Sequence, residues 1–167
     1  MKILIFSDNH RNRENVMLIL SRHQDALHFI SLGDSEMSEV ELSNLGIYGV
    51  RGNYPFEPPF PDELLMTFEG WRFFLAHGHK HGVKNSLTRL YAAAKEQNAD
   101  VACFGHTHRA FLEDASDLIF LNPGSLQSPR GISYPTYAIV DVTETKLQIH
   151  VRDAHSGRII IELIKKR

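Results

Sequence analysis

Five polar clusters restrict the fold of this 167-residue chain more than any other feature of its sequence, because each comes immediately after an apolar run of strand length. In open α/β sheets, the carboxyl ends of the strands are where ligands gather. Five such ends can therefore bring side chains that are far apart in the sequence into one crevice. The clusters are Asp8-Asn9-His10, Gly33-Asp34, Gly52-Asn53, His77-Gly78 and Gly105-His106-Thr107-His108.

The apolar pattern predicts an α/β fold. Helical patterns over residues 12–21, 38–45 and 86–97 separate strand-like runs, and the first half of the chain alternates strand and helix. This alternation is typical of parallel β-α-β units, whereas the closer strands of the second half have hairpin-like spacing. We expect a mixed α/β sandwich in one domain over residues 1–167. Predicted strands lie at 3–6, 26–32, 47–50, 64–68, 71–76, 101–104, 118–121, 137–140 and 147–151.

Composition and charge limit the partners. Hydrophobic residues make up 43% and charged residues 23% of the chain, as in ordinary globular proteins. A net charge of -2 with scattered basic residues disfavours long nucleic acids. The apolar run at residues 3–6 is too short for a signal peptide or a membrane span, so we expect a cytoplasmic protein without a membrane partner. Unpaired strand edges are compatible with a homo-oligomer.

The polar clusters supply ligands typical of a transition-metal site. Four imidazoles, two carboxylates and one amide suit Mn, Fe, Co, Ni or Zn better than Ca or Mg. Seven ligands are too many for one open catalytic ion, and two divalent ions with two carboxylates leave a positive surplus that attracts a phosphate. Singly, each cluster is more often a turn or a surface residue; together they favour a site. The candidate ligands are Asp8, His10, Asp34, Asn53, His77, His106 and His108.

Local spacing gives two further expectations. Asp8 with His10, and His106 with His108, stand at i and i+2, and in an extended segment this spacing points both side chains to the same side. Glycine precedes Asp34 and several other candidate ligands, as expected where the backbone turns sharply or approaches a bound group. Cys103 lies within an apolar run, so we expect a buried structural thiol.

The motif order Asp-x-His, Gly-Asp, Gly-Asn, His-Gly and Gly-His-x-His resembles the calcineurin-like metallophosphoesterases. The small single-domain phosphodiesterase branch of that family is similar in a further segment, Asn122-Pro123-Gly124-Ser125, which Pro129-Arg130 follows. The resemblance implies a four-layer α-β-β-α sandwich of two mixed β-sheets flanked by helices. It also implies two divalent transition-metal ions, with manganese expected and Ni, Fe, Co or Zn as alternatives.

The resemblance assigns the ligands and the nucleophile. A hydroxide that bridges the ions would attack phosphorus in line. One ion would be held by Asp8, His10, Asp34 and His108. The other would be held by Asp34, Asn53, His77 and His106.

The sequence departs from the family after Asn53. Many relatives have His or Cys-Asp at that place, whereas this chain has Tyr54-Pro55. A phenol is a reluctant general acid at neutral pH, so we expect the best turnover on diesters with good leaving groups. Tyr54 would pack at the substrate entrance, with His79 or His81 as proton donor, although a solvated turn explains these two histidines equally well.

Two residues after the first cluster are candidates for substrate binding. Arg11 and Asn12 are placed to contact a phosphate, although an Arg at a helix start is more often solvated. The predicted function is metal-dependent hydrolysis of a small phosphodiester. The alternatives are a non-catalytic scaffold, which the small retromer subunit exemplifies, and a phosphomonoesterase or nuclease of the same family.

Overall fold

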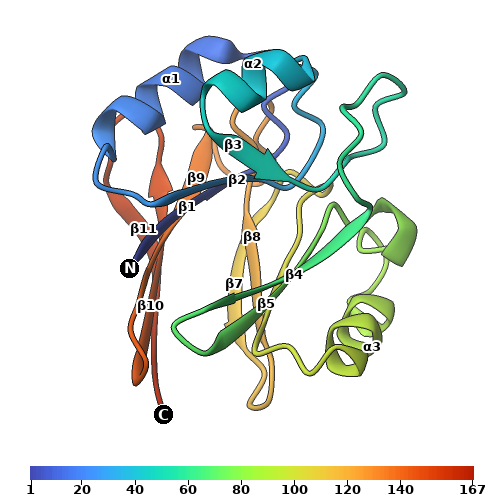
Figure 1. Cartoon of the computed structure of the whole chain (residues 1–167), viewed down its shortest axis with the longest axis vertical. Coiled ribbons are helices and arrows are strands. Elements are labelled where there is room, and N and C mark those ends of the chain that lie inside the picture. The colour runs from blue at the N-terminus through green and yellow to red at the C-terminus, as the bar shows by residue number, and fades with distance from the viewer.

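The structure, a computed structural model of residues 1–167, contains two β-sheets that pack face to face, with helices on their outer faces (Figure 1). The order of strands in the first sheet is β11 (Ile159–Lys166), β10 (Lys146–Asp153), β9 (Thr136–Val142), β1 (Lys2–Phe6), β2 (His28–Ser31) and β3 (Ile47–Gly49). The order in the second sheet is β4 (Glu63–Phe68), β5 (Trp71–Ala76), β6 (Val101–Cys103), β8 (Ile119–Pro123) and β7 (Ala110–Asp114).

Both sheets are mixed. Strands β1, β2 and β3 are parallel, and the helices α1 (Arg13–Arg22) and α2 (Glu39–Asn44) form the crossovers between them. Strands β9, β10 and β11 form an antiparallel meander that joins β1. In the second sheet, β5, β6 and β8 are parallel, α3 (Thr88–Glu96) connects β5 to β6, and β4 and β7 run antiparallel at the edges. The predicted sandwich of two mixed sheets with flanking helices is confirmed.

Strand β1 shows why the sequence builds layers. Ile3 and Ile5 belong to the core between the sheets, whereas Leu4 and Phe6 belong to the core beneath α1. Successive side chains of a strand point to opposite faces. Because both faces of this strand are covered, all four residues are apolar and fully buried.

Three hydrophobic cores hold the layers together. The inter-sheet core contains 19 buried residues, including Cys103, so the expected buried thiol is confirmed. The first outer core contains 12 residues, among them Val16 and Ile19 of α1. The second outer core contains 10 residues, among them Leu90 and Ala94 of α3. The spacing of three or four residues within each helix places these side chains on one face.

Two strands were not predicted. Strands β7 and β11 are edge strands whose side chains are only partly buried or exposed, so their sequences lack a long apolar run. Periodicity is a weaker signal at an edge, because one face of the strand contacts solvent or charged neighbours. Residues 53–61, which are rich in proline, contain neither helix nor strand, as expected. No helix in the structure is long and apolar enough to cross a membrane.

Replacing Phe73 by Ala should reduce the free energy of unfolding by about 3–5 kcal/mol, because the ring is fully buried in the inter-sheet core. Phe56 offers a matched control, since 81% of it is exposed. Phe56→Ala should change the stability by less than about 0.5 kcal/mol. Urea unfolding of both variants measures the difference, and equal midpoints would contradict the packing described here.

Candidate metal centre

Backbone hydrogen bonds bring the first two polar clusters together beyond the ends of β1 and β2. The amide of Asp8 donates to the carbonyl of Gly33 at 3.1 Å, and that of His10 donates to the carbonyl of Asp34 at 3.1 Å. The parallel pairing of the two strands therefore continues into the loops. In the second sheet, the amide of Gly105 donates to the carbonyl of His77 at 2.9 Å and joins the ends of β5 and β6 in the same way.

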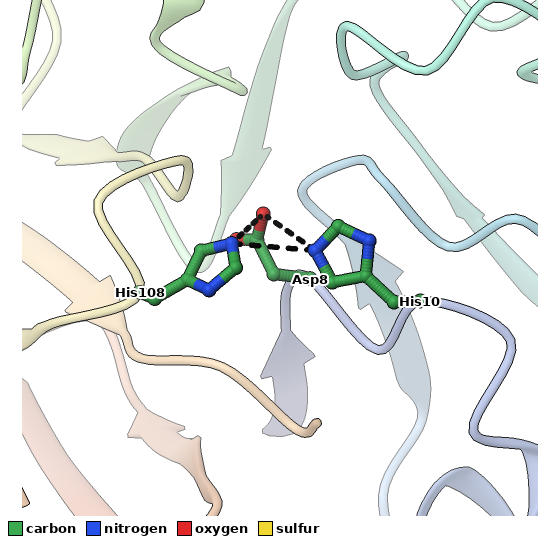
Figure 2. Close-up of side chains that lie close together, drawn as sticks. All are labelled: Asp8, His10 and His108. Atoms are coloured by element: carbon green, nitrogen blue, oxygen red, sulfur yellow. Dashed lines mark hydrogen bonds and ion pairs between the residues drawn. The ribbon is translucent and has the colours of Figure 1, made fainter. Parts of the chain in front are cut away.

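Asp8, His10 and His108 form the first group of potential metal ligands (Figure 2). Oδ1 of Asp8 lies 3.2 Å from Nε2 of His108 and 3.8 Å from Nε2 of His10. The two Nε2 atoms are 3.3 Å apart. Asp8 and His10 follow the first sheet and His108 follows the second, so this group spans both sheets.

Asp8, Asp34 and His77 form a second group that shares Asp8 with the first. Nε2 of His77 lies 3.8 Å from Oδ1 of Asp8 and 3.5 Å from Oδ2 of Asp34. The same Nε2 atom is 3.0 Å from Oδ1 of Asn53. His106 borders this group, because its ring centroid is 5.1 Å from that of His77.

The backbone at the ligands is left-handed rather than extended, which corrects the expectation for the i and i+2 pairs. Ten non-glycine residues have positive φ, and seven of them lie in the ligand segments. Both members of each pair are among them, with φ between 40° and 67°. The strands end before the ligands, so turns of unfavourable conformation, held by the surrounding hydrogen bonds, aim the side chains inward. The seven residues are Asp8, His10, Arg11, Asp34, Glu36, His106 and His108.

Two glycines permit the close approach of these segments. A Cβ atom on Gly52 would lie 2.0 Å from Oδ1 of Asp34, and one on Gly105 would lie 2.0 Å from Oγ of Ser7. Neither distance can accommodate a side chain without a shift of the ligand loops. The expectation that glycines mark close approach of the backbone is confirmed at both positions.

The hydrogen bonding of the Asp8 carboxylate indicates whether the residues present fit a metal ion. Its Oδ2 accepts hydrogen bonds from Oγ of Ser7 and from the amide of His106, whereas its Oδ1 is buried and has no hydrogen-bond partner. Burial of a carboxylate oxygen without a donor is costly unless a cation faces it. Together with imidazole nitrogens on several sides, this orphaned oxygen fits a divalent transition metal.

The charges of the site keep its carboxylates ionised. Burial alone would raise the pKa of Asp34, but hydrogen bonding and charge from His77 outweigh burial and lower the pKa to about 2. For Asp8, contacts with His108 and His77 likewise outweigh burial and lower the pKa. Burial and the charge of His77 lower the pKa of His106 to about 4, so its imidazole is neutral and free to bind a metal at neutral pH.

Outer hydrogen bonds orient the imidazoles. Nδ1 of His10 is 2.8 Å from Oε1 of Glu36, Nδ1 of His77 is 2.7 Å from the carbonyl oxygen of Leu32, and Nδ1 of His108 is 2.8 Å from that of Ser128. Each contact turns the other ring nitrogen toward the site, as partners of metal-bound histidines do. The sequence did not reveal these partners, because a backbone carbonyl has no sequence signal and Glu36 belongs to no motif.

Two acidic residues near the site also escaped sequence reasoning. Glu36 and Glu57 belong to no motif, yet Glu57 accepts hydrogen bonds from the amides of Glu36 and Gly52. Glu57 therefore ties the proline-rich loop to two ligand segments. Burial raises the pKa of Glu57. The only sequence signal for Glu36 and Glu57 is that they lie close to Asp34 and Asn53 in the chain.

The structure separates the remaining predicted residues. Tyr54 lies at the site, where its amide donates to Asp34 Oδ1 at 2.9 Å and its hydroxyl is 3.5 Å from Nη2 of Arg11. His79 borders the site, since its ring centroid is 5.4 Å from that of His77. His81 is instead buried against Phe74, with Nε2 2.8 Å from Oε1 of Glu63.

Asn12 caps helix α1. Its Oδ1 accepts from the amide of Asn15 at 2.9 Å, and its Nδ2 donates to Gln127. Both polar atoms of the side chain are thus engaged by the protein, which leaves Arg11 as the better candidate for contact with a substrate.

Comparison with known proteins agrees with this geometry. The calcineurin-like phosphoesterase superfamily domain matches residues 1–145. The chain is 37% identical over 161 residues to the probable metallophosphoesterase YsnB of Bacillus subtilis, with 95% of each chain covered. It is 33% identical over 106 residues to the phosphodiesterase YfcE of Escherichia coli, which covers 57% of this chain and 52% of YfcE. The protein therefore belongs to the calcineurin-like phosphoesterase superfamily, whose members are metal-dependent.

Solved structures support the same fold. A predicted phosphoesterase of Streptococcus pneumoniae superposes with a TM-score of 0.88 at 25% identity, and the match covers 99% of this chain and 97% of that one. Vacuolar protein sorting 29 of Cryptosporidium parvum superposes with a TM-score of 0.80 at 18% identity over 99% and 98% of the two chains. The second likeness shows the fold alone.

His106 should make the stability of the metal-free protein depend on pH. Its folded-state pKa of about 4 is below the ordinary value of 6.5, so the unfolded state binds more protons between these values. The contribution of His106 to stability is therefore complete above about pH 6.5 and lost as the pH falls toward about 4.

His106→Gln should flatten this part of the stability profile, measured by urea unfolding in the presence of a chelator. His155→Gln, at an exposed position, is the control and should retain the slope of the unmodified protein. Identical slopes in all three proteins would contradict the role of His106.

Proposed function

We propose that this protein is a dinuclear metal-dependent phosphodiesterase that hydrolyses a small phosphodiester. The observation that carries the proposal is the buried Oδ1 atom of Asp8, which has no hydrogen-bond donor and lies between two groups of potential ligands. Membership in a metal-dependent phosphoesterase superfamily and likeness to YfcE, which is named a phosphodiesterase, support it.

In this proposal the chain would hold two ions, Asp34 would contribute a ligand to both, and manganese is the expected metal. Asp34 belongs to the second group, where its Oδ2 lies 3.5 Å from Nε2 of His77, and it is joined to the first group through Asp8, which the two groups share. The first ion would be held by Asp8, His10, Asp34 and His108. The second would be held by Asp34, Asn53, His77 and His106.

Bound divalent ions would supply Lewis-acid stabilisation of the negative charge that develops on the phosphoryl oxygens and would lower the pKa of water. The residues of the chain would orient the ligands and neutralise part of the charge of the ions. The lowered pKa values of Asp8 and Asp34 keep both carboxylates charged at neutral pH, and Glu36 fixes the ring of His10. Arg11, exposed at the site and next to Tyr54, is placed to bind a non-bridging phosphate oxygen.

The site has no strong proton donor for the leaving group. His79 borders the ligand cluster, and its Nδ1 is buried without a hydrogen-bond partner. Burial lowers the pKa of His79, so the ring is neutral at neutral pH and is a weak proton donor. We therefore propose that His79 assists departure modestly, that Tyr54 borders the leaving group, and that diesters with good leaving groups react fastest.

A non-catalytic scaffold is the rival function, since Vps29 proteins share the fold. All seven candidate ligands are present in this chain and converge on two ligand groups or their immediate neighbours. A Vps29 of Entamoeba histolytica was solved in complex with zinc, so hydrolysis with added Mn, rather than metal content alone, separates the two functions. Among the enzymatic alternatives, the net charge of -2 argues against a nuclease.

Asp34→Asn should lower kcat/KM on bis(p-nitrophenyl) phosphate by about a hundredfold or more, because loss of even an outer partner of a metal ligand costs 10–100-fold. A panel of phosphodiesters and phosphomonoesters, assayed with Mn, Ni, Zn and Mg, measures the effect and the preferred ester class. Asp25→Asn, an exposed carboxylate in the α1–β2 loop, serves as the control and should retain activity.

Full activity of Asp34→Asn would exclude the bridged centre. A preference for monoesters in the panel would exclude the diesterase. Absence of hydrolysis of every ester with all four metals in the unmodified protein would favour the scaffold instead.

His79→Gln should slow diesters with poor leaving groups about tenfold more than those with good ones, because general acids matter most where the leaving group is basic. The slope of log kcat against the acidity of a series of phenol leaving groups is the measurement. His81→Gln is the control from the same turn, and the contact of its ring with Glu63 predicts no change in slope. An unchanged slope in His79→Gln would remove His79 from the mechanism.

A further inference from the structure

A cavity of about 760 Å³ opens beside the candidate metal centre. Thr107, which separates His106 from His108 in the sequence, lines it. The other walls come from the loop before α3, the start of β7, residues 130–132 and the start of β11. The cavity therefore borders the segment that carries two of the candidate metal ligands, although the proposed mechanism uses none of its lining side chains.

Three cations line this cavity and have no acidic partner. Lys84, Arg109 and Arg130 are the charged residues among the lining side chains, and no Asp or Glu is present. None of the three forms an ion pair, whereas five other Lys and Arg residues of the chain do. A net charge of -2 does not predict such a cluster. Three unpaired cations around one hollow attract an anion.

The cations are attached to the ligand segments. Arg109 follows His108 directly, and the amide of Arg130 donates to the carbonyl of His108 at 2.9 Å. Lys84 comes from the loop between β5 and α3, which follows His77. An anion in the cavity would thus border the segments that carry His106, His108 and His77.

The exposed side chain of Arg109 lies against Gly131. Gly131 has a φ of 82°, and a Cβ atom there would lie 2.8 Å from Nη1 of Arg109. The guanidinium therefore packs across the backbone of Gly131, at the edge of the cavity. A guanidinium at this edge presents paired N–H donors, which match two oxygens of a phosphate.

The remaining wall is apolar. Phe104 and Phe111 line the cavity with ring centroids 6.4 Å apart, and Ile132 adds a further apolar surface. Such a wall suits an organic group that connects one phosphate to the next. With only three cations, the cavity suits a small molecule rather than a long polyanion.

We propose that this cavity binds a second phosphate group of the substrate, so that the preferred diester carries a further phosphate on one organic ester arm. The proposal rests on the phosphodiesterase function proposed above and names its substrate class. The reacting phosphodiester lies at the metal centre. The terminal phosphate contacts Arg109, Arg130 and Lys84, and the organic arm packs on the aromatic wall.

A matched pair of substrates tests this subsite. The p-nitrophenyl ester of thymidine 5′-phosphate and the same ester with a 3′-phosphate differ only in one terminal phosphate. With Mn-loaded protein, kcat/KM should be about tenfold or more higher for the 3′-phosphorylated ester, which corresponds to about 1.4 kcal/mol. Because the contact is ionic, added salt should reduce this ratio.

The variant Arg109→Gln/Arg130→Gln should reduce the ratio of the two kcat/KM values to less than about threefold, which leaves under about 0.7 kcal/mol of discrimination. Lys84→Gln, at an exposed position, should lower it partly and provides a second variant if the double variant folds poorly. Lys166→Gln removes an unpaired cation at the other end of β11 and should retain the ratio.

The outcomes separate the two proposals. A ratio near one in the unmodified protein, or an unchanged ratio in both cavity variants, would overturn the subsite while hydrolysis of either ester upholds the diesterase. Hydrolysis of bis(p-nitrophenyl) phosphate without hydrolysis of the 3′-phosphorylated ester would also overturn the subsite alone. Absence of hydrolysis of every diester would overturn the proposed function, and the subsite with it.

Discussion

The burial of one carboxylate, that of Asp8, is the constraint on which the rest of the site depends. One oxygen is held by Ser7 and by the amide of His106, and the other has no donor. A charged group removed from water needs compensating positive charge. Imidazole rings surround this oxygen, and the donor set suits a divalent ion, so the electrostatic requirement of Asp8 accounts for the composition of the strand ends around it.

This constraint also links the site to the core. Asp8 and Asp34 come from one sheet, whereas His77 and His108 come from the other, so the packing of the two sheets sets the distances among them. The left-handed backbone at the ligands is unfavourable by itself and persists because hydrogen bonds between the loops over-determine it. The rigid inter-sheet core thus supports strained turns that aim the ligands inward.

Under the two proposals, reaction chemistry and substrate choice would come from different parts of the molecule. The candidate ligands all lie within residues 1–145, the part of the chain that matches the calcineurin-like phosphoesterase superfamily domain. The cavity with Lys84, Arg109 and Arg130 lies beside the ligand cluster and adds positive charge and apolar surface to it. A fold that keeps its centre on rigid strand ends can vary such neighbouring loops, which set specificity.

The sequence by itself determined the sandwich of mixed sheets and the strand-end place of the candidate ligands, because periodicity and residue order are local signals. It did not reveal the edge strands β7 and β11, whose half-exposed faces lack long apolar runs. Only the tertiary structure decided the left-handed turns, the contact of Glu36 with His10, and the convergence of cations around the cavity. These features depend on contacts between segments that are distant in the sequence, and spacing along a chain does not encode the direction in which a side chain points once the strand has ended.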